Sequence, residues 1–185
     1  MSCEMKLPEW LPAFVSEWDG DLKSDDDRMG LAIALSKANI SRTGGGPFGA
    51  VVYDLEAGRL LGVGVNLVTT SNLSCAHGEI VAISMAQQAS GSWNLGENGR
   101  VELVTSCEPC AMCFGAVPWS GVRRLVCGAR KEDAEAAGFD EGDKPRDWKE
   151  SLVRRGIEVK VDVLRDEAAD VFKYYSENSG VIYNP

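Results

Sequence analysis

The chain has 185 residues, of which 44% are hydrophobic and 25% charged, and its formal net charge is −9. This length and composition are ordinary for a soluble globular protein, and we expect one domain over residues 1–185. The charge counts against long nucleic acids as partners, because an acidic surface repels their phosphates. No apolar run approaches the roughly 20 residues that cross a bilayer, and the N-terminus lacks a signal-peptide pattern. We therefore expect a cytoplasmic protein without a membrane partner.

The two ends of the chain differ from its middle. Residues 1–25 predict a loosely structured N-terminal arm that leads into a helix, and about 176–185 form a C-terminal tail. Apolar residues from Leu31 to Ala38 recur at helical spacing, which predicts a helix there. That helix is expected to end before TGGGPFGA, because three glycines and a proline are typical of a turn.

The rest of the chain alternates between strand and helix patterns. Two short apolar runs around Glu56–Arg59 predict a β-hairpin. Apolar and charged residues alternate from Ile157 to Val163, as in a strand near a sheet edge. A helix is expected to carry Pro109 in its first turn, where proline costs little. The predicted strands are 50–55, 60–65, 101–105, 124–127 and 157–163, and the predicted helices are 76–89, 108–117, 148–155 and one through Ala168, Val171, Phe172 and Tyr175.

The order of these elements determines the predicted fold class. Strand–helix–strand alternation after the hairpin implies parallel strand pairs with helices on both faces of the sheet. We therefore predict an α/β protein, a three-layer α/β/α sandwich around a mixed sheet of about five strands.

Cysteine usage suggests metal binding rather than disulfides. Three of the six cysteines lie within residues 107–113, and the chain shows no export signal. Crowded cysteines in a reducing compartment more often bind metal or take part in chemistry.

His77, Cys110 and Cys113 are the candidate metal ligands. His77 is the only histidine of the chain, and cysteines three apart on a helix share one face. Three protein ligands with an open fourth position are typical of catalytic zinc. Cys110 lies 33 positions after His77, enough for a helix, a loop and a strand. A parallel unit of that length brings both predicted helix starts to one end of the sheet.

Glu79 distinguishes a catalytic site from a structural one. A zinc ion with two thiolate ligands is nearly neutral, so it acidifies its bound water less than a zinc ion with three histidine ligands does. A neighbouring carboxylate can take the proton of that water instead. Taken singly, these features have ordinary alternatives: His77 as a hydrogen-bonded residue, and Cys107 with Cys110 as a redox pair. The joint pattern HxE followed by PCxxC favours catalytic zinc.

These motifs resemble the zinc deaminases, which include cytidine, cytosine, guanine and tRNA-adenosine deaminases. The resemblance runs from about residue 45 to 137. More narrowly, GGPFGAVV, NLVTTSN, SCEPCAMCFGA and AGFDEG resemble bacterial guanine deaminases, which extends the match to about residue 142. The resemblance implies the cytidine deaminase-like fold and one Zn²⁺ per chain. The arm and the last forty residues match less clearly.

The resemblance also implies roles for individual residues. His77, Cys110 and Cys113 would hold zinc, and Glu79 would shuttle a proton from water to the ring. Glu141, or its neighbour Asp140, would be a second proton shuttle. The remaining implied residues would bind the substrate base, namely Asn66 by hydrogen bonds, Phe48 by stacking, Trp119 as a pocket wall, and Ala76.

The implied reaction is the hydrolytic deamination of guanine to xanthine and ammonia. Alternatives within the family are guanosine, cytosine, an ammeline-type aminotriazine and tRNA adenosine, and a non-catalytic zinc scaffold is the alternative outside enzymes. The expected partner is a small nucleobase. Most relatives of this type are dimers, so the resemblance implies a homodimer. In one arrangement, the two copies exchange C-terminal segments, and Tyr175 and Tyr183 help to close the partner's site.

Overall fold

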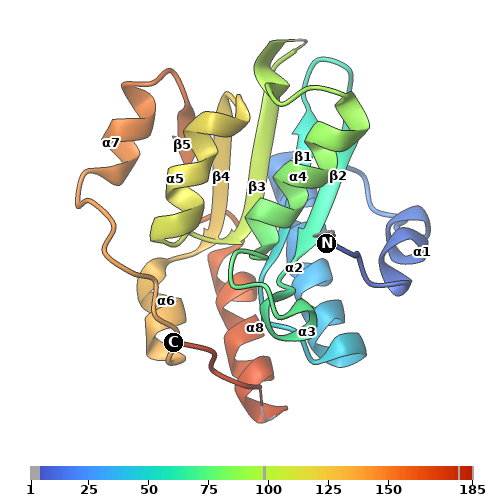
Figure 1. Ribbon diagram of the computed structural model, residues 1–185, viewed down its shortest axis with the longest axis vertical. Helices are drawn as coiled ribbons and strands as arrows, with labels where there is room; N and C mark the ends of the chain where they lie inside the picture. The colour runs from blue at the N-terminus through green and yellow to red at the C-terminus, as the bar shows by residue number, and fades with distance from the viewer. Residues whose placement is uncertain (1–4, 98, 179, 185) are drawn as a thin grey trace.

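A five-stranded mixed sheet forms the middle layer of the protein (Figure 1). The structure is a computed structural model, and it describes residues 5–97, 99–178 and 180–184. The strand order is β2-β1-β3-β4-β5. The strands are β1 (Gly49–Asp54), β2 (Arg59–Val65), β3 (Val101–Cys107), β4 (Arg124–Ala129) and β5 (Glu158–Lys160).

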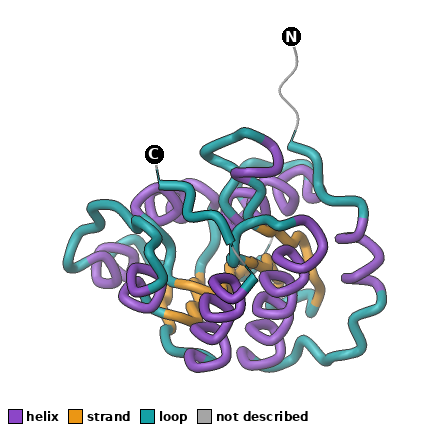
Figure 2. Tube along the Cα trace, turned by 90° about the horizontal axis from the view of Figure 1, so that it is seen from below, coloured by secondary structure: helices purple, strands orange, loops and turns teal. Residues whose placement is uncertain are grey.

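Helices cover both faces of this sheet, which confirms the predicted three-layer sandwich. α2 and α8 pack on one face, whereas α4 and α5 lie side by side on the other (Figures 1 and 2). The helices are α1 (Trp10–Ser16), α2 (Asp25–Thr43), α3 (Val68–Ser71), α4 (Gly78–Ser90), α5 (Ala111–Ser120), α6 (Lys131–Ala136), α7 (Trp148–Val153) and α8 (Arg165–Glu177), with a 3₁₀ turn at Leu95–Glu97.

The strand directions bring two helix starts together. β1 runs antiparallel to both β2 and β3, whereas β3, β4 and β5 are parallel. β2 and β3 therefore point the same way and end at the same edge of the sheet. α4 follows β2 and α5 follows β3, so both helices begin at that edge.

Local sequence explains the main elements. Ser24 and Asp27 form a capping box at the start of α2, and Gly44 takes the left-handed conformation that ends it. β1, β3 and β4 are buried at every position. Helices on both sheet faces bury both sides of these strands, so most of their residues are apolar and the charged ones, such as Glu102 and Arg124, are paired.

Several elements depart from the sequence expectations. The N-terminal arm contains α1, whose Trp10 and Phe14 rings lie 5.6 Å apart beneath the Arg42 guanidinium. α3 and α6 are short helices, and the sequence shows no clear helical period of apolar residues that would predict them. β5 is shorter than predicted, because Asp162 and Leu164 adopt left-handed backbone angles after it. Residues 1–4, including Cys3, lie outside the described residues.

The position of Pro109 also differs from the expectation. α5 begins at Ala111 with Cys110 as its N-cap, so Pro109 precedes the helix instead of occupying its first turn. Among the described residues, no helix combines the length and apolarity that a membrane span requires.

A buried ion pair network fixes the sheet end opposite the helix starts. The Glu102 carboxylate at the start of β3 is fully buried and pairs with Arg28 of α2 and with Arg124 of β4. Asp25 bridges the same two guanidinium groups, at 2.9 Å and 2.7 Å.

We predict that Glu102→Gln lowers the free energy of unfolding by about 3–5 kcal/mol, because two guanidinium groups lose a buried partner. Urea denaturation measures this change. The matched control is Glu158→Gln, which removes the half-exposed carboxylate that also pairs with Arg124 and is expected to cost less than about 1 kcal/mol. Equal losses in the two variants would contradict this account.

Candidate metal centre

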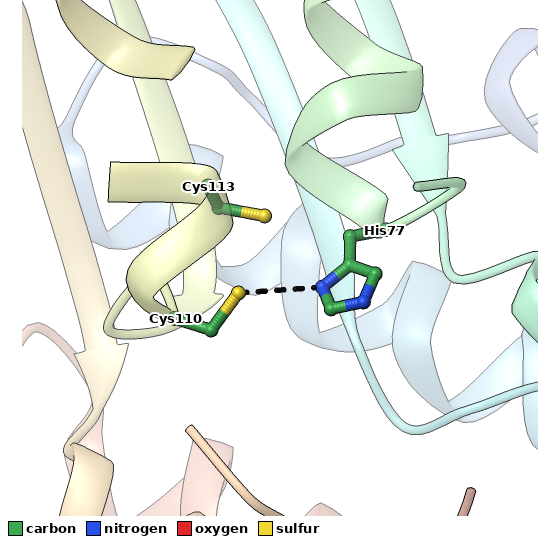
Figure 3. Close-up of side chains that lie close together, drawn as sticks. All are labelled: His77, Cys110 and Cys113. Atoms are coloured by element: carbon green, nitrogen blue, oxygen red, sulfur yellow. Dashed lines mark hydrogen bonds between the residues drawn. The ribbon is translucent and has the colours of Figure 1, made fainter. Parts of the chain in front are cut away.

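His77, Cys110 and Cys113 converge where α4 and α5 begin (Figure 3). His77 is the N-cap of α4 and Cys110 is the N-cap of α5, and Cys113 lies in the first turn of α5. The Cys110 Sγ lies 3.5 Å from the His77 Nδ1. One nitrogen and two sulfur atoms therefore lie within 4.8 Å of one another.

This donor set fits a tetrahedral zinc ion. Zinc bonds of about 2.0–2.3 Å to nitrogen and sulfur place neighbouring ligand atoms about 3.5–4 Å apart. The Cys110–His77 distance of 3.5 Å lies in that range. Two thiolates and an imidazole are donors that zinc prefers, and three protein ligands leave its fourth position open.

The hydrogen bond between the two cysteines leaves Cys110 as a thiolate, whose negative charge favours binding of a cation. A hydrogen bond from Cys113 lowers the pKa of Cys110 to about 4, against the opposing effect of burial, and the neighbouring His77 lowers it further. The same hydrogen bond, together with burial, raises the pKa of Cys113. A bound metal ion would displace that proton, since metals bind the thiolate form.

Two buried carboxyl groups face the metal ligands. Glu79 lies in the first turn of α4, and Glu141 lies in the segment between α6 and α7. Burial raises the pKa of Glu79 to about 7 and that of Glu141 to about 8, and the nearby Cys110 thiolate raises both. Carboxyl groups with such pKa values can both accept and donate protons near neutral pH.

These groups open onto a cavity of about 320 Å³. Its walls include aromatic rings from distant segments: the Phe48 and Phe139 rings pack edge to face at 5.0 Å, and Phe139 packs on Tyr183 at 5.5 Å. Its lining includes five of the predicted site residues and one residue of the C-terminal tail, namely Phe48, His77, Glu79, Cys110, Glu141 and Tyr183.

The C-terminal tail closes one side of this cavity. The Tyr175 hydroxyl donates to the Val181 carbonyl at 2.7 Å, which fixes the tail on α8. The Asn184 amide accepts from the Asp140 N–H and donates to the Gly138 carbonyl, beside Glu141. Asp140 and Asn184 also line the cavity. The sequence indicates Tyr183 as a tail residue that could close a site, but nothing in the sequence pattern shows whether that site is its own or the partner's.

Asn66 lies beside the cavity. A Cβ atom on Gly46 would lie 2.3 Å from the Tyr183 hydroxyl and 2.9 Å from the Asn66 Oδ1, so glycine is required between these side chains. The Asn66 Nδ2 and the Tyr183 hydroxyl are both buried without a hydrogen-bond partner in the described protein. Buried polar groups of this kind usually have a partner, such as a ligand or water.

The structure does not bring Trp119 and Ala76 to the cavity lining. Trp119 is 80% exposed and absent from the lining of the cavity within one chain, so its role as a pocket wall stays a prediction. It lies two turns beyond Met112, which lines the cavity, and therefore near the opposite end of α5. Ala76 is buried, and its N–H and carbonyl are bonded to Leu73 and Leu67.

Comparison with known proteins is consistent with this geometry. The family model of the cytidine and deoxycytidylate deaminase zinc-binding region matches residues 22–129. The fold and the ligand cluster thus define a zinc-binding deaminase domain. The chain belongs to the cytidine and deoxycytidylate deaminase family, as the motifs predicted.

Within this family, the chain is similar to guanine deaminases. The chain is 40% identical over 110 residues to a guanine deaminase of Bacillus subtilis, covering 60% of this chain and 67% of that protein. It superposes on the guanine deaminase structure from Nitrosomonas europaea with a TM-score of 0.88 and 42% identity, covering 96% of this chain and 97% of that one. A structure solved in complex with 2,6-diaminopurine gives a TM-score of 0.89 and 44% identity, covering 98% and 96%.

We predict one zinc ion per chain in the purified protein, lost in Cys113→Ser because a hydroxyl is a poor zinc ligand. Elemental analysis by mass spectrometry measures the metal content. The control is Cys107→Ala, since Cys107 is buried with its thiol facing the Arg130 carbonyl. The ligand assignment fails if Cys113→Ser keeps its zinc or if Cys107→Ala loses it.

Proposed function

We propose that this protein hydrolyses guanine to xanthine and ammonia, with zinc held by His77, Cys110 and Cys113. The observation that carries the proposal is the placement of two buried carboxyl groups, Glu79 and Glu141, on a cavity that is also lined by the candidate ligands His77 and Cys110. A zinc site that serves only the fold has no need of buried proton donors or of an open cavity. The similarity to two guanine deaminases favours this substrate.

The cavity supplies the contacts that a neutral purine requires. Phe48 offers a ring face or edge to the base, since aromatic walls supply much of the binding energy of such sites. The Asn66 Nδ2 and the Tyr183 hydroxyl, both without a partner in the described protein, lie beside Gly46, two residues before Phe48 in the chain. Hydrogen bonds from these groups to the base satisfy both of them and orient the amino-bearing carbon toward the metal ligands.

The chemistry then requires proton transfers that the two carboxyl groups can perform. When bound, zinc supplies the Lewis acidity that makes water nucleophilic near neutral pH. Glu79 takes a proton from the attacking water and delivers it to N3 of the ring. The water oxygen ends on C2 as a hydroxyl group, and Glu79 or Glu141 takes its remaining proton and passes it to the amino group. The C2–N bond then breaks, ammonia leaves, and C2 keeps the oxygen as a carbonyl. The protein returns to its starting protonation state, because each proton it accepts is passed on.

Ammonia release from a panel of rings tests this proposal. The zinc-loaded protein is offered guanine, guanosine, cytosine, adenine and ammeline in parallel. We expect rapid release from guanine. Ammonia release only from another ring would support the reaction class but contradict guanine as the substrate. Strong binding of tRNA would favour the tRNA adenosine alternative. No release from any ring, with zinc verified, would favour the non-catalytic scaffold.

Glu79→Ala is expected to keep its zinc and lose turnover by about 100- to 10,000-fold, because a positioned general acid–base group contributes that much. Ammonia release and metal content are measured on the same preparation. Glu97→Ala is the control, since Glu97 lies in the 3₁₀ turn outside the cavity lining. Full activity in Glu79→Ala would eliminate the proposed proton transfers.

We also propose that two copies pair through the outer face of α5. This face contains Met112, Gly115 and Trp119 at helical spacing, and α5 carries no charged residue. A neutral apolar face lets two copies of a chain with a net charge of −9 meet without placing like charges together. The tail contacts described above are made within one chain, and exchange of tails between copies stays a prediction.

Trp119→Glu is predicted to convert a dimer into monomers, because it places two like charges in the paired face. Sedimentation velocity measures the change, and Val153→Glu is the control at an exposed apolar position on α7. A wild-type monomer, or an unchanged dimer in Trp119→Glu, would refute this interface. Mixing Glu79→Ala chains with chains truncated after Glu177 tests exchange, since only exchanged tails restore activity.

A further inference from the structure

Lys144 lies buried behind the metal ligands and is not part of the chemistry described above. It belongs to the segment that joins α6 to α7 (Figure 1). Its side chain is 3% exposed, and its Nζ donates to the Pro109 carbonyl at 2.8 Å. A lysine is almost never buried to this extent unless its charge has a partner.

The partner charge is the Glu108 carboxylate. The Lys144 Nζ lies 3.6 Å from a Glu108 oxygen, and the Glu108 side chain is only 6% exposed. The Trp148 ring covers the Lys144 ammonium at 4.3 Å from the ring centroid, a cation–π contact. Lys149 also faces Glu108 at 3.6 Å, but its side chain is 40% exposed.

These contacts tie together the two segments that build the site. The Pro109 carbonyl belongs to the peptide group that enters Cys110, so its position affects the backbone of a metal ligand. The Ala111 N–H donates to the Glu141 carbonyl at 2.9 Å, across the same junction. Lys144 follows Glu141 by three residues and therefore anchors the carboxyl-bearing segment to the cysteine-bearing loop.

We propose that Lys144 is a positioning residue of the metal centre, which holds the Pro109–Cys110 peptide and the Glu108 carboxylate and thereby sets the geometry of Cys110. The proposal rests on the proposed function only for its consequence in catalysis. Metal ligands that neighbouring groups hold in place by hydrogen bonds bind metal more firmly, and loss of such a neighbouring group typically costs about 10- to 100-fold in metal affinity or activity.

A purely structural ion pair is the alternative role for Lys144. In that case Lys144 only neutralises Glu108. The double variant that removes both charges would then regain both the melting temperature and the zinc retention that Lys144→Met loses. The hydrogen bond to Pro109 distinguishes the two roles, because removal of both charges does not replace it. Lys149 is the matched control, since it faces the same carboxylate at the same distance, whereas the hydrogen bond to the Pro109 carbonyl comes from Lys144.

The experiment compares zinc loss to a coloured chelator in the wild type, Lys144→Met, Lys144→Arg, Lys149→Met and the double variant Glu108→Gln/Lys144→Met. The absorption bands of the cobalt-substituted proteins report the geometry of the thiolate ligands, and the melting temperature reports folding. kcat and KM for guanine are measured separately. The zinc and cobalt measurements need no substrate, so an inactive wild type would contradict the proposed function without affecting this test.

We expect zinc loss about tenfold faster or more in Lys144→Met, with altered cobalt bands, and less than twofold faster in Lys149→Met. Lys144→Arg, which keeps a cationic donor, should lie within about threefold of the wild type. The double variant should regain the melting temperature but not the zinc retention. If Lys144→Met does not fold, zinc loss from the double variant is compared with that from the wild type and Lys149→Met instead. Recovery of both properties in the double variant, or equal zinc loss in Lys144→Met and Lys149→Met, would overturn the proposal.

Discussion

The meeting of two helix N-termini at one sheet edge is the constraint on which the site depends. His77 and Cys110 cap neighbouring helices, and Cys113 lies one turn into the second. Helix starts carry partial positive charge, which stabilises thiolates before any metal arrives. The strand directions produce this meeting, because β2 and β3 end at the same edge although β1 lies between them. An apolar sheet buried on both faces thus fixes the separation of three polar ligands.

The surroundings of the ligands determine what the site can do. Glu79 comes from α4 and Glu141 from the α6–α7 segment, and burial raises the pKa of both carboxyl groups. Phe48 follows the glycine-rich turn, and Tyr183 comes from the C-terminal tail. Segments from across the whole chain therefore contribute to one small cavity. A purine bound there meets aromatic walls, unpartnered hydrogen-bonding groups and proton donors together, which is the combination that deamination requires.

Much of this arrangement could be predicted from the sequence. The alternation of hairpin, helices and strands predicted the sandwich, and the HxE and PCxxC motifs singled out the residues that cluster at the helix starts. The position of Trp119 could not be predicted, because helical spacing does not show which face of α5 meets the cavity. The place of Tyr183 depends on how the tail packs, and Lys144 looks like any lysine of an acidic surface. Such residues become visible only when long-range contacts are known, since no local period encodes them.

The most direct test of the central claim is to convert guanine in water enriched in oxygen-18 and to analyse the products by mass spectrometry. The cavity lining includes the two carboxyl groups, Glu79 and Glu141, that can move protons from water, and in the proposed reaction the water oxygen bonds directly to C2. We therefore predict xanthine with one oxygen-18 atom at C2 and one ammonia per xanthine, formed only by the zinc-loaded protein. Guanine left unchanged by that protein, or xanthine without the label, would contradict the account.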